Sequence, residues 1–128
     1  MKSHFSKSRL IIHLGFVLLI SCSTSRFSSD SEMDTYYNKE LVNIENKFAM
    51  HLNKDIDSLT IEQFVFRNYV YPGMGIRNKF VYGNRKLWRL FKRNGHGDPE
   101  RISVFLLKSY YQRKKTGKNV KFKEALIL

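Results

Sequence analysis

The stretch that decides the fold runs from Asn84 to Gly117 and reads NRKLWRLFKRNGHGDPERISVFLLKSYYQRKKTG. Its first part predicts a helix that Asn84 caps and Gly95 ends. At about 100° per residue, apolar side chains fill one arc of this helix and basic side chains fill the opposite arc, with no acid among them. The apolar arc holds Leu87, Trp88, Leu90 and Phe91. The basic arc holds Arg85, Lys86, Arg89, Lys92 and Arg93.

The second part of this stretch predicts a longer helix that begins at Asp98 and stops near Gly117. Asp98 is a good N-cap, Pro99 suits the first helical position, and Glu100 places an acid in the first turn. Apolar residues then occupy several sides, so we expect this helix to be the most buried element. Asn84 to Lys115 would form a helical hairpin.

Towards the N-terminus, an apolar stripe predicts a helix from about Glu32 to Asn53, with Ser31 as its N-cap. The stripe consists of Tyr37, Leu41, Ile44, Phe48 and Leu52. It gives the helix one face for the core. We expect His51, beside the stripe, to face solvent or pack rather than to bind a metal.

The sequence patterns of segments 60–71 and 119–123 fit either a helix or a strand. Thr60 and Gln63 have capping-box spacing, which favours a helix over the first segment, but alternate residues from Phe64 to Val70 also fit a strand. In the second segment, residues alternate between apolar and basic, which fits a short strand or a final helical turn. Between the helices, Tyr71-Pro72-Gly73 predicts a type II turn, and 76–83 stays ambiguous.

Together these patterns predict a mostly α fold: a small domain of three to four helices packed in antiparallel fashion, with short strand pieces near 60–71 and 119–123 as the alternative to helix there. The expected core is made by Phe48, Phe64, Leu87, Trp88, Leu90, Phe105 and Tyr110.

The first 22 residues read as an export signal. A basic start with Lys2, Lys7 and Arg9 precedes a short apolar run that ends at Leu19-Ile20-Ser21-Cys22. The run is too short to span a bilayer, which takes roughly 20 apolar residues. The Leu-Ile-Ser-Cys tetrad resembles the lipobox of bacterial lipoproteins. That resemblance implies cleavage before Cys22 and attachment of a diacylglycerol, with fatty chains such as palmitate, to its sulfur.

This resemblance covers only the first 22 residues. It sets where the mature chain begins and therefore how the rest of the chain divides. Residues 1–21 would be the lipoprotein signal peptide, 22–30 the lipidated Cys22 with a Ser/Thr-rich tether, and 31–128 a single basic globular domain. The protein would then be lipid-anchored at the cell envelope. Ser23 after the lipidated Cys22 fits the outer-membrane pattern if the source is Gram-negative.

Charge is spread unevenly along the chain. The whole chain carries a formal net charge of +12, and removal of the three leader bases leaves +9. Acids outnumber bases between 30 and 63, whereas bases dominate from 64 to 123. Such a surplus indicates an anionic partner.

We therefore interpret the protein as a noncatalytic binding or assembly module. Its partner surface would be Arg85, Lys86, Arg89, Lys92 and Arg93, facing an anionic lipid head, a glycan or an acidic envelope protein. Basic residues interleaved with aromatics also occur in nucleic-acid binders, but export argues against that partner. A solvated face that only maintains solubility is the competing interpretation.

The alternative function is a small envelope hydrolase that uses His96 with Asp98 as an acid–base pair. Helix capping by Asp98 explains the same residue without catalysis. The chain has no nucleophile-elbow, zinc-protease or phosphate-loop motif, and only His51 and His96 follow residue 22. We therefore expect no metal site and no cofactor.

Overall fold

The computed structural model describes residues 27–128, in which helices are the only regular secondary structure and no strand is present. The chain divides into two compact units, Met1–Glu32 and Met33–Leu128, which are considered separately. The mostly α fold class is confirmed. The elements are α2 (Asp30–Leu52), η1 (Ile56–Ser58), α3 (Ile61–Asn68), α4 (Gly73–Ile76), the π-helix η2 (Arg77–Tyr82), α5 (Arg85–Arg93), α6 (Pro99–Thr116) and α7 (Phe122–Ala125).

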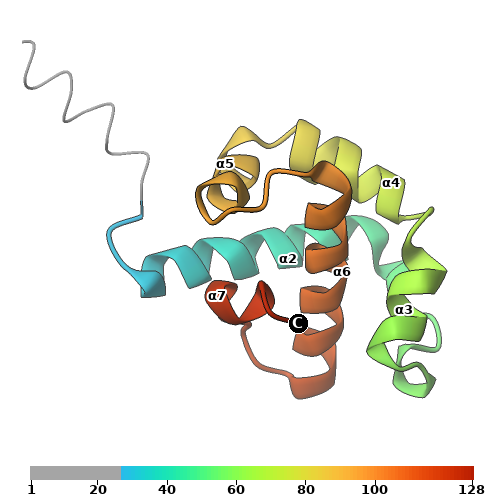
Figure 1. The fold of residues 1–128 in the computed structure, drawn as a ribbon. Helices are drawn as coiled ribbons and strands as arrows, with labels where there is room; N and C mark the ends of the chain where they lie inside the picture. The colour runs from blue at the N-terminus through green and yellow to red at the C-terminus, as the bar shows by residue number, and fades with distance from the viewer. Residues whose placement is uncertain (1–26) are drawn as a thin grey trace, which may run out of the picture. The chain divides into compact units, whose positions relative to one another are not determined.

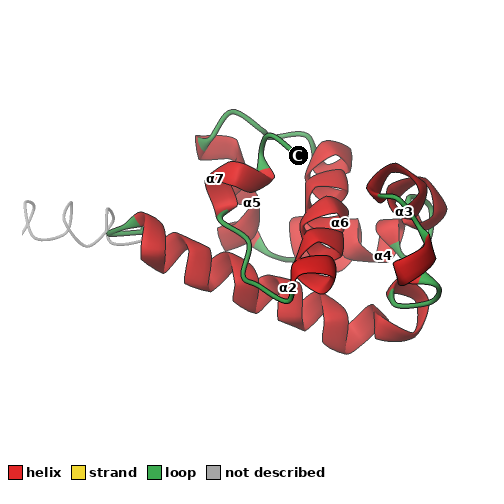
Figure 2. Ribbon diagram, turned by 90° about the horizontal axis from the view of Figure 1, so that it is seen from below, coloured by secondary structure: helices red, strands yellow, loops and turns green. Residues whose placement is uncertain are grey.

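Helix α6 is the central element of the second unit. It packs against α3, α4 and η2 on one side and against α5 and α7 on the other (Figure 1). In Figure 1, α5 is seen nearly end-on while α6 is seen from the side, so these helices cross. The predicted antiparallel hairpin is therefore wrong. α2 also crosses α6 rather than lying alongside it (Figure 2).

Aromatic rings join α2, α5 and α7 in the core. The Tyr37 ring lies 6.0 Å from Phe91 and 5.1 Å from Phe122, and the Phe91 and Phe122 rings are 5.1 Å apart. Phe91 also stacks on Phe105 of α6 at 5.9 Å. All of the predicted core residues are buried except Trp88, which is only half-buried.

The start of α2 differs by two residues from the prediction. The helix begins at Asp30, and the Ser29 hydroxyl accepts a hydrogen bond from the Glu32 amide at 3.1 Å. Glu32 also accepts a hydrogen bond from the Ser28 amide at 3.1 Å. Ser29 therefore satisfies a free amide of the first turn, and the assignment of Ser31 as the cap is wrong.

The segment 60–71 is helical, and the strand alternative is wrong. Thr60 and Gln63 form the reciprocal capping box, with bonds of 2.9 and 3.2 Å between backbone amides and side-chain oxygens. These bonds stabilise the helix start. Burial then follows a spacing of four, because Phe64 and Asn68 are buried, whereas Phe66 is 87% exposed.

The segment 119–123 is not a strand because its backbone bonds to side chains of α2. The Asn38 amide donates to the Val120 carbonyl at 2.8 Å and accepts from the Val120 amide at 2.9 Å. The Asp34 carboxylate accepts from the Phe122 amide at 2.8 Å. These bonds dock the tail and let α7 begin at Phe122.

The predicted type II turn at Tyr71-Pro72-Gly73 is also wrong. Pro72 has ψ of 8°, and Gly73 begins α4 without a positive φ. A side chain at Gly73 would place its Cβ 2.7 Å from the Asn68 carbonyl oxygen, so the glycine allows the end of α3 to approach closely. The ambiguous residues 76–83 continue α4 as the π-helix η2.

Candidate functional site

Helix α5 begins after Asn84 and ends just before Gly95, the two residues that the sequence predicts at its ends. The Asn84 side chain accepts from the Leu87 amide at 3.1 Å, which makes Asn84 the N-cap. Asn94 ends the helix, and Gly95 follows with φ of 86°, the left-handed conformation that glycine adopts readily.

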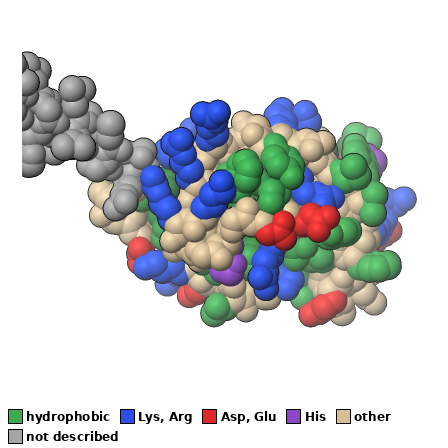
Figure 3. Space-filling model, turned by 45° about the horizontal axis from the view of Figure 1, so that its top comes forward, with side chains coloured by type: hydrophobic (Ala, Val, Ile, Leu, Met, Phe, Trp, Pro, Cys, Tyr) green, Lys and Arg blue, Asp and Glu red, His purple; other side chains and the backbone are tan. Residues whose placement is uncertain are grey.

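The two arcs of α5 separate as the wheel predicts. Leu87, Leu90 and Phe91 are buried. The basic face, defined as the five residues of the basic arc, is exposed throughout: Arg85, Lys86, Arg89, Lys92 and Arg93. Figure 3 shows Lys and Arg side chains gathered on this side of the molecule with no acidic side chain among them.

Trp88 is half-buried beside the basic face and does not lie in the core, which corrects the prediction. Its indole N–H donates to the Gly97 carbonyl at 3.0 Å, and the Lys92 ammonium lies 4.0 Å from the ring centroid. These contacts hold the ring at the surface. An open hollow of about 180 Å³, the α5 hollow, is lined by Arg85, Trp88, Arg89 and Lys92.

A second aromatic ring positions Lys86. Its ammonium lies 4.5 Å from the centroid of Tyr36, whose hydroxyl donates to Asn84 at 3.3 Å. Burial, followed by the nearby Glu40 charge, raises the pKa of Tyr36 to about 12, although the Asn84 hydrogen bond opposes this shift. Tyr36 therefore stays neutral at physiological pH and offers a π face to the cation.

Four ion pairs of the described residues involve side chains outside α5. Arg77 pairs with Glu100 at 3.1 Å, and Lys114 pairs with Glu45 at 2.7 Å. The other two pairs involve Asp55 and Asp57. None of these four pairs involves Arg85, Arg89 or Lys92, the three cations that line the α5 hollow.

His96 and Asp98 do not form a pair. The Asp98 carboxylate accepts from the Glu100 amide as the N-cap of α6, which confirms its capping role. The His96 ring packs edge-on against Phe105 at 4.9 Å, and its buried Nδ1 has no hydrogen-bond partner. No hydrogen bond between these two side chains is present in residues 27–128, so the geometry adds nothing to the hydrolase alternative.

Comparison with known families gives a match over residues 38–114 to the model for a domain of unknown function, DUF6794. The chain belongs to the DUF6794 family. The matched segment contains all of α5 and its basic face. No curated protein and no solved structure matches the chain.

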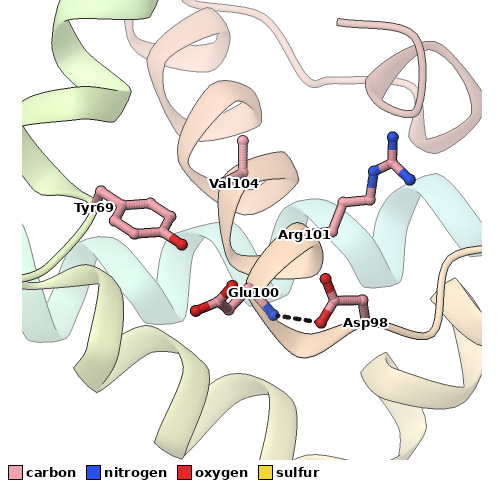
Figure 4. A pocket seen from close by; sticks show the side chains of 5 residues that line it. All are labelled: Tyr69, Asp98, Glu100, Arg101 and Val104. Atoms are coloured by element: carbon pink, nitrogen blue, oxygen red, sulfur yellow. Dashed lines mark hydrogen bonds between the residues drawn. The ribbon is translucent and has the colours of Figure 1, made fainter.

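Sequence reasoning missed a second hollow of the DUF6794 domain. It has a volume of about 300 Å³ and is lined by Tyr69, Asp98, Glu100, Arg101 and Val104 (Figure 4). Arg77 stacks over the Tyr69 ring at 5.4 Å and pairs with Glu100, which ties the end of α3 to the start of α6. No sequence signal joins these residues because tertiary packing alone brings them together.

Other predictions concern metals and the membrane. No group of three or more metal-ligating side chains occurs among residues 27–128. Over the same residues, no helix combines the length and the apolar character that a membrane span requires. Cys22, the lipobox and the signal peptide lie outside the described residues.

Proposed function

We propose that this DUF6794 protein is a lipid-anchored, noncatalytic binding module of the cell envelope whose basic face binds an anionic partner. The observation that carries the proposal is the exposure of five cations on one face of α5, three of which line one open hollow. The favoured partner is an anionic lipid headgroup. Near a membrane each basic residue contributes about 1 kcal/mol at an anionic surface.

The arrangement of the cations supports binding rather than simple solvation. Lys86 and Lys92 are each held over an aromatic ring, at 4.5 and 4.0 Å. Holding a long side chain in place reduces the rotamer entropy that binding would otherwise cost. The α5 hollow adds Arg85 and Arg89, whose guanidinium groups suit bidentate contacts with phosphate or carboxylate.

Co-sedimentation with vesicles tests the surface. The chain from Ser23 to Leu128, with its helicity checked by circular dichroism, should pellet with anionic but not with neutral vesicles. Binding should weaken steeply as salt rises, because the Debye length shortens from about 10 Å at 0.1 M to about 3 Å at 1 M. Absence of pelleting at low salt would reject the lipid as partner, and cross-linking in cells would then test glycan and acidic protein partners.

The anchor is tested separately by Cys22→Ser in cells. We expect this variant to move from the membrane fraction to the soluble fraction, because it lacks the sulfur to which the acyl chains attach. Fractionation followed by immunoblotting measures the change, and Ser25→Ala in the tether is the matched control. A Cys22→Ser protein that is still processed and still pellets with membranes would overturn the lipoprotein assignment.

A further inference from the structure

A third hollow lies between α2 and η2, away from the residues of the basic face. It is open, has a volume of about 450 Å³ and is called here the lysine hollow. Its lining residues are Asn43, Asn46, Lys47, Lys79 and Phe80. Except for Phe80, which is buried, all of these side chains are exposed to solvent.

Two lysine side chains, Lys47 of α2 and Lys79 of η2, line the lysine hollow together. The pKa of Lys47 is lowered, first by a side-chain hydrogen bond with Lys79, then by repulsion from the Lys79 charge, and least by burial. An ammonium group has three donors and no acceptor, so two charged lysines cannot satisfy each other. An anion between them would accept from both and remove the repulsion.

The surroundings offer donors and no counter-charge. Among the described residues, no hydrogen bond engages the side-chain amides of Asn43 and Asn46, and no carboxylate lines the hollow. Glu45, the acid nearest to Lys47 in sequence, is held on another side of α2 by Lys114 at 2.7 Å. The hollow is thus built to donate hydrogen bonds to a negatively charged group.

The backbone also favours a site here. Lys79 is on the π-helix η2, and π-helical turns are rare and occur frequently at functional sites. A phosphate monoester is close to a dianion at pH 7, because its second pKa is about 6, and its charge matches two ammonium groups. The volume of about 450 Å³ exceeds what one phosphate group fills, which leaves room for the molecule that carries it.

We propose that Lys47 and Lys79, with the amides of Asn43 and Asn46, bind a phosphate group carried by a larger molecule. This site shares no residue with the basic face and does not depend on the function proposed for it. The phosphate could come from a lipid headgroup or from a soluble phosphate ester, and the test separates the two.

The test uses the full-length chain and inorganic phosphate as the probe. Calorimetry should show saturable binding, and the Lys47 ε-carbon resonance should report a pKa that rises when phosphate is added. Lys47→Ala and Lys79→Ala should each weaken binding about tenfold, because each removes a hydrogen bond to a charged group. Lys118→Ala, which removes an exposed lysine elsewhere, should leave binding unchanged.

Stability measurements separate lost binding from lost folding. Removing one of two repelling charges should not lower the melting temperature, so weaker phosphate binding by a Lys79→Ala protein with unchanged melting supports the site. Lys79→Ala should also raise the pKa of Lys47 towards its ordinary value without ligand. Absence of saturable binding, or equal weakening by Lys118→Ala, would overturn the proposal.

Vesicles identify the source of the phosphate. If Lys47→Ala weakens binding to phosphatidylcholine vesicles that contain phosphatidate, the phosphate is that of a lipid. If it weakens only the binding of inorganic phosphate, the carrier is a soluble ester. Because the Lys47 resonance reports the lysine hollow alone, its response to phosphate should be the same in the Arg89→Glu protein as in the wild type, so failure of the basic face and failure of the lysine hollow remain distinguishable.

Discussion

Exchange of Arg89 and Lys92 for glutamate is expected to abolish the binding of this domain to anionic vesicles. Both side chains are exposed on α5 and line the α5 hollow. Two lost attractions of about 1 kcal/mol each and two repulsions of similar size amount to about 4 kcal/mol, or about a thousandfold in affinity. Co-sedimentation with phosphatidylglycerol vesicles at low salt measures the loss.

A charge-matched control shows whether vesicle binding depends on the position of the charges on α5 or only on the net charge of the protein. Lys118→Glu with Lys121→Glu changes the net charge by the same amount at two exposed residues of the C-terminal segment. This pair should weaken vesicle binding only slightly if α5 is the partner surface. Equal losses in the two double variants would show that the protein binds through its overall charge and has no defined surface.

The second large effect is expected for Phe91→Ala, which should destabilise the domain by about 3–5 kcal/mol. Phe91 is fully buried, and its ring contacts Tyr37, Phe105 and Phe122. Its removal leaves a cavity where α2, α5, α6 and α7 meet. Because small domains are stable by only about 5–15 kcal/mol, this change removes a large part of the folding free energy.

Denaturant unfolding followed by circular dichroism measures this loss. Phe91→Leu, which keeps most of the apolar volume, should cost much less than alanine. Trp88→Ala on the same helix should also cost less, because the indole is only half-buried. A loss below about 1 kcal/mol for Phe91→Ala would contradict the central position assigned to this ring.

The helix starts could be predicted from the sequence because a capping side chain bonds to a backbone amide within one helical turn, so both residues are close together along the chain. Asn84, Asp98 and Thr60 cap the helices for which their sequence context predicts this role, and Gly117 ends α6 with φ of 67°. The strand alternatives could not be excluded from sequence, because the bonds that dock Val120 come from Asn38, far away along the chain. The crossing of α5 and α6 likewise depends on tertiary packing.

The candidate site was predictable in part. A helical wheel identifies the five exposed cations, because burial of Leu87 and Leu90 fixes how α5 faces the core. The same wheel wrongly placed Trp88 in the core. That residue lies at the edge of the apolar arc, and its indole N–H donates a hydrogen bond to the Gly97 carbonyl, which holds the ring near the surface. Nothing in the sequence pairs Lys47 with Lys79, since α2 and η2 meet only in the folded chain.

The most direct test of the basic face uses Trp88, the single tryptophan of the chain, as a fluorescent reporter in the α5 hollow. The full-length protein should show a saturable change in emission when phosphatidylglycerol vesicles are added at low salt. The Arg89→Glu, Lys92→Glu variant should show none, and salt should reverse the change in the wild type. If Trp88 emission stays constant while the protein pellets with the vesicles, the basic face is not the partner surface.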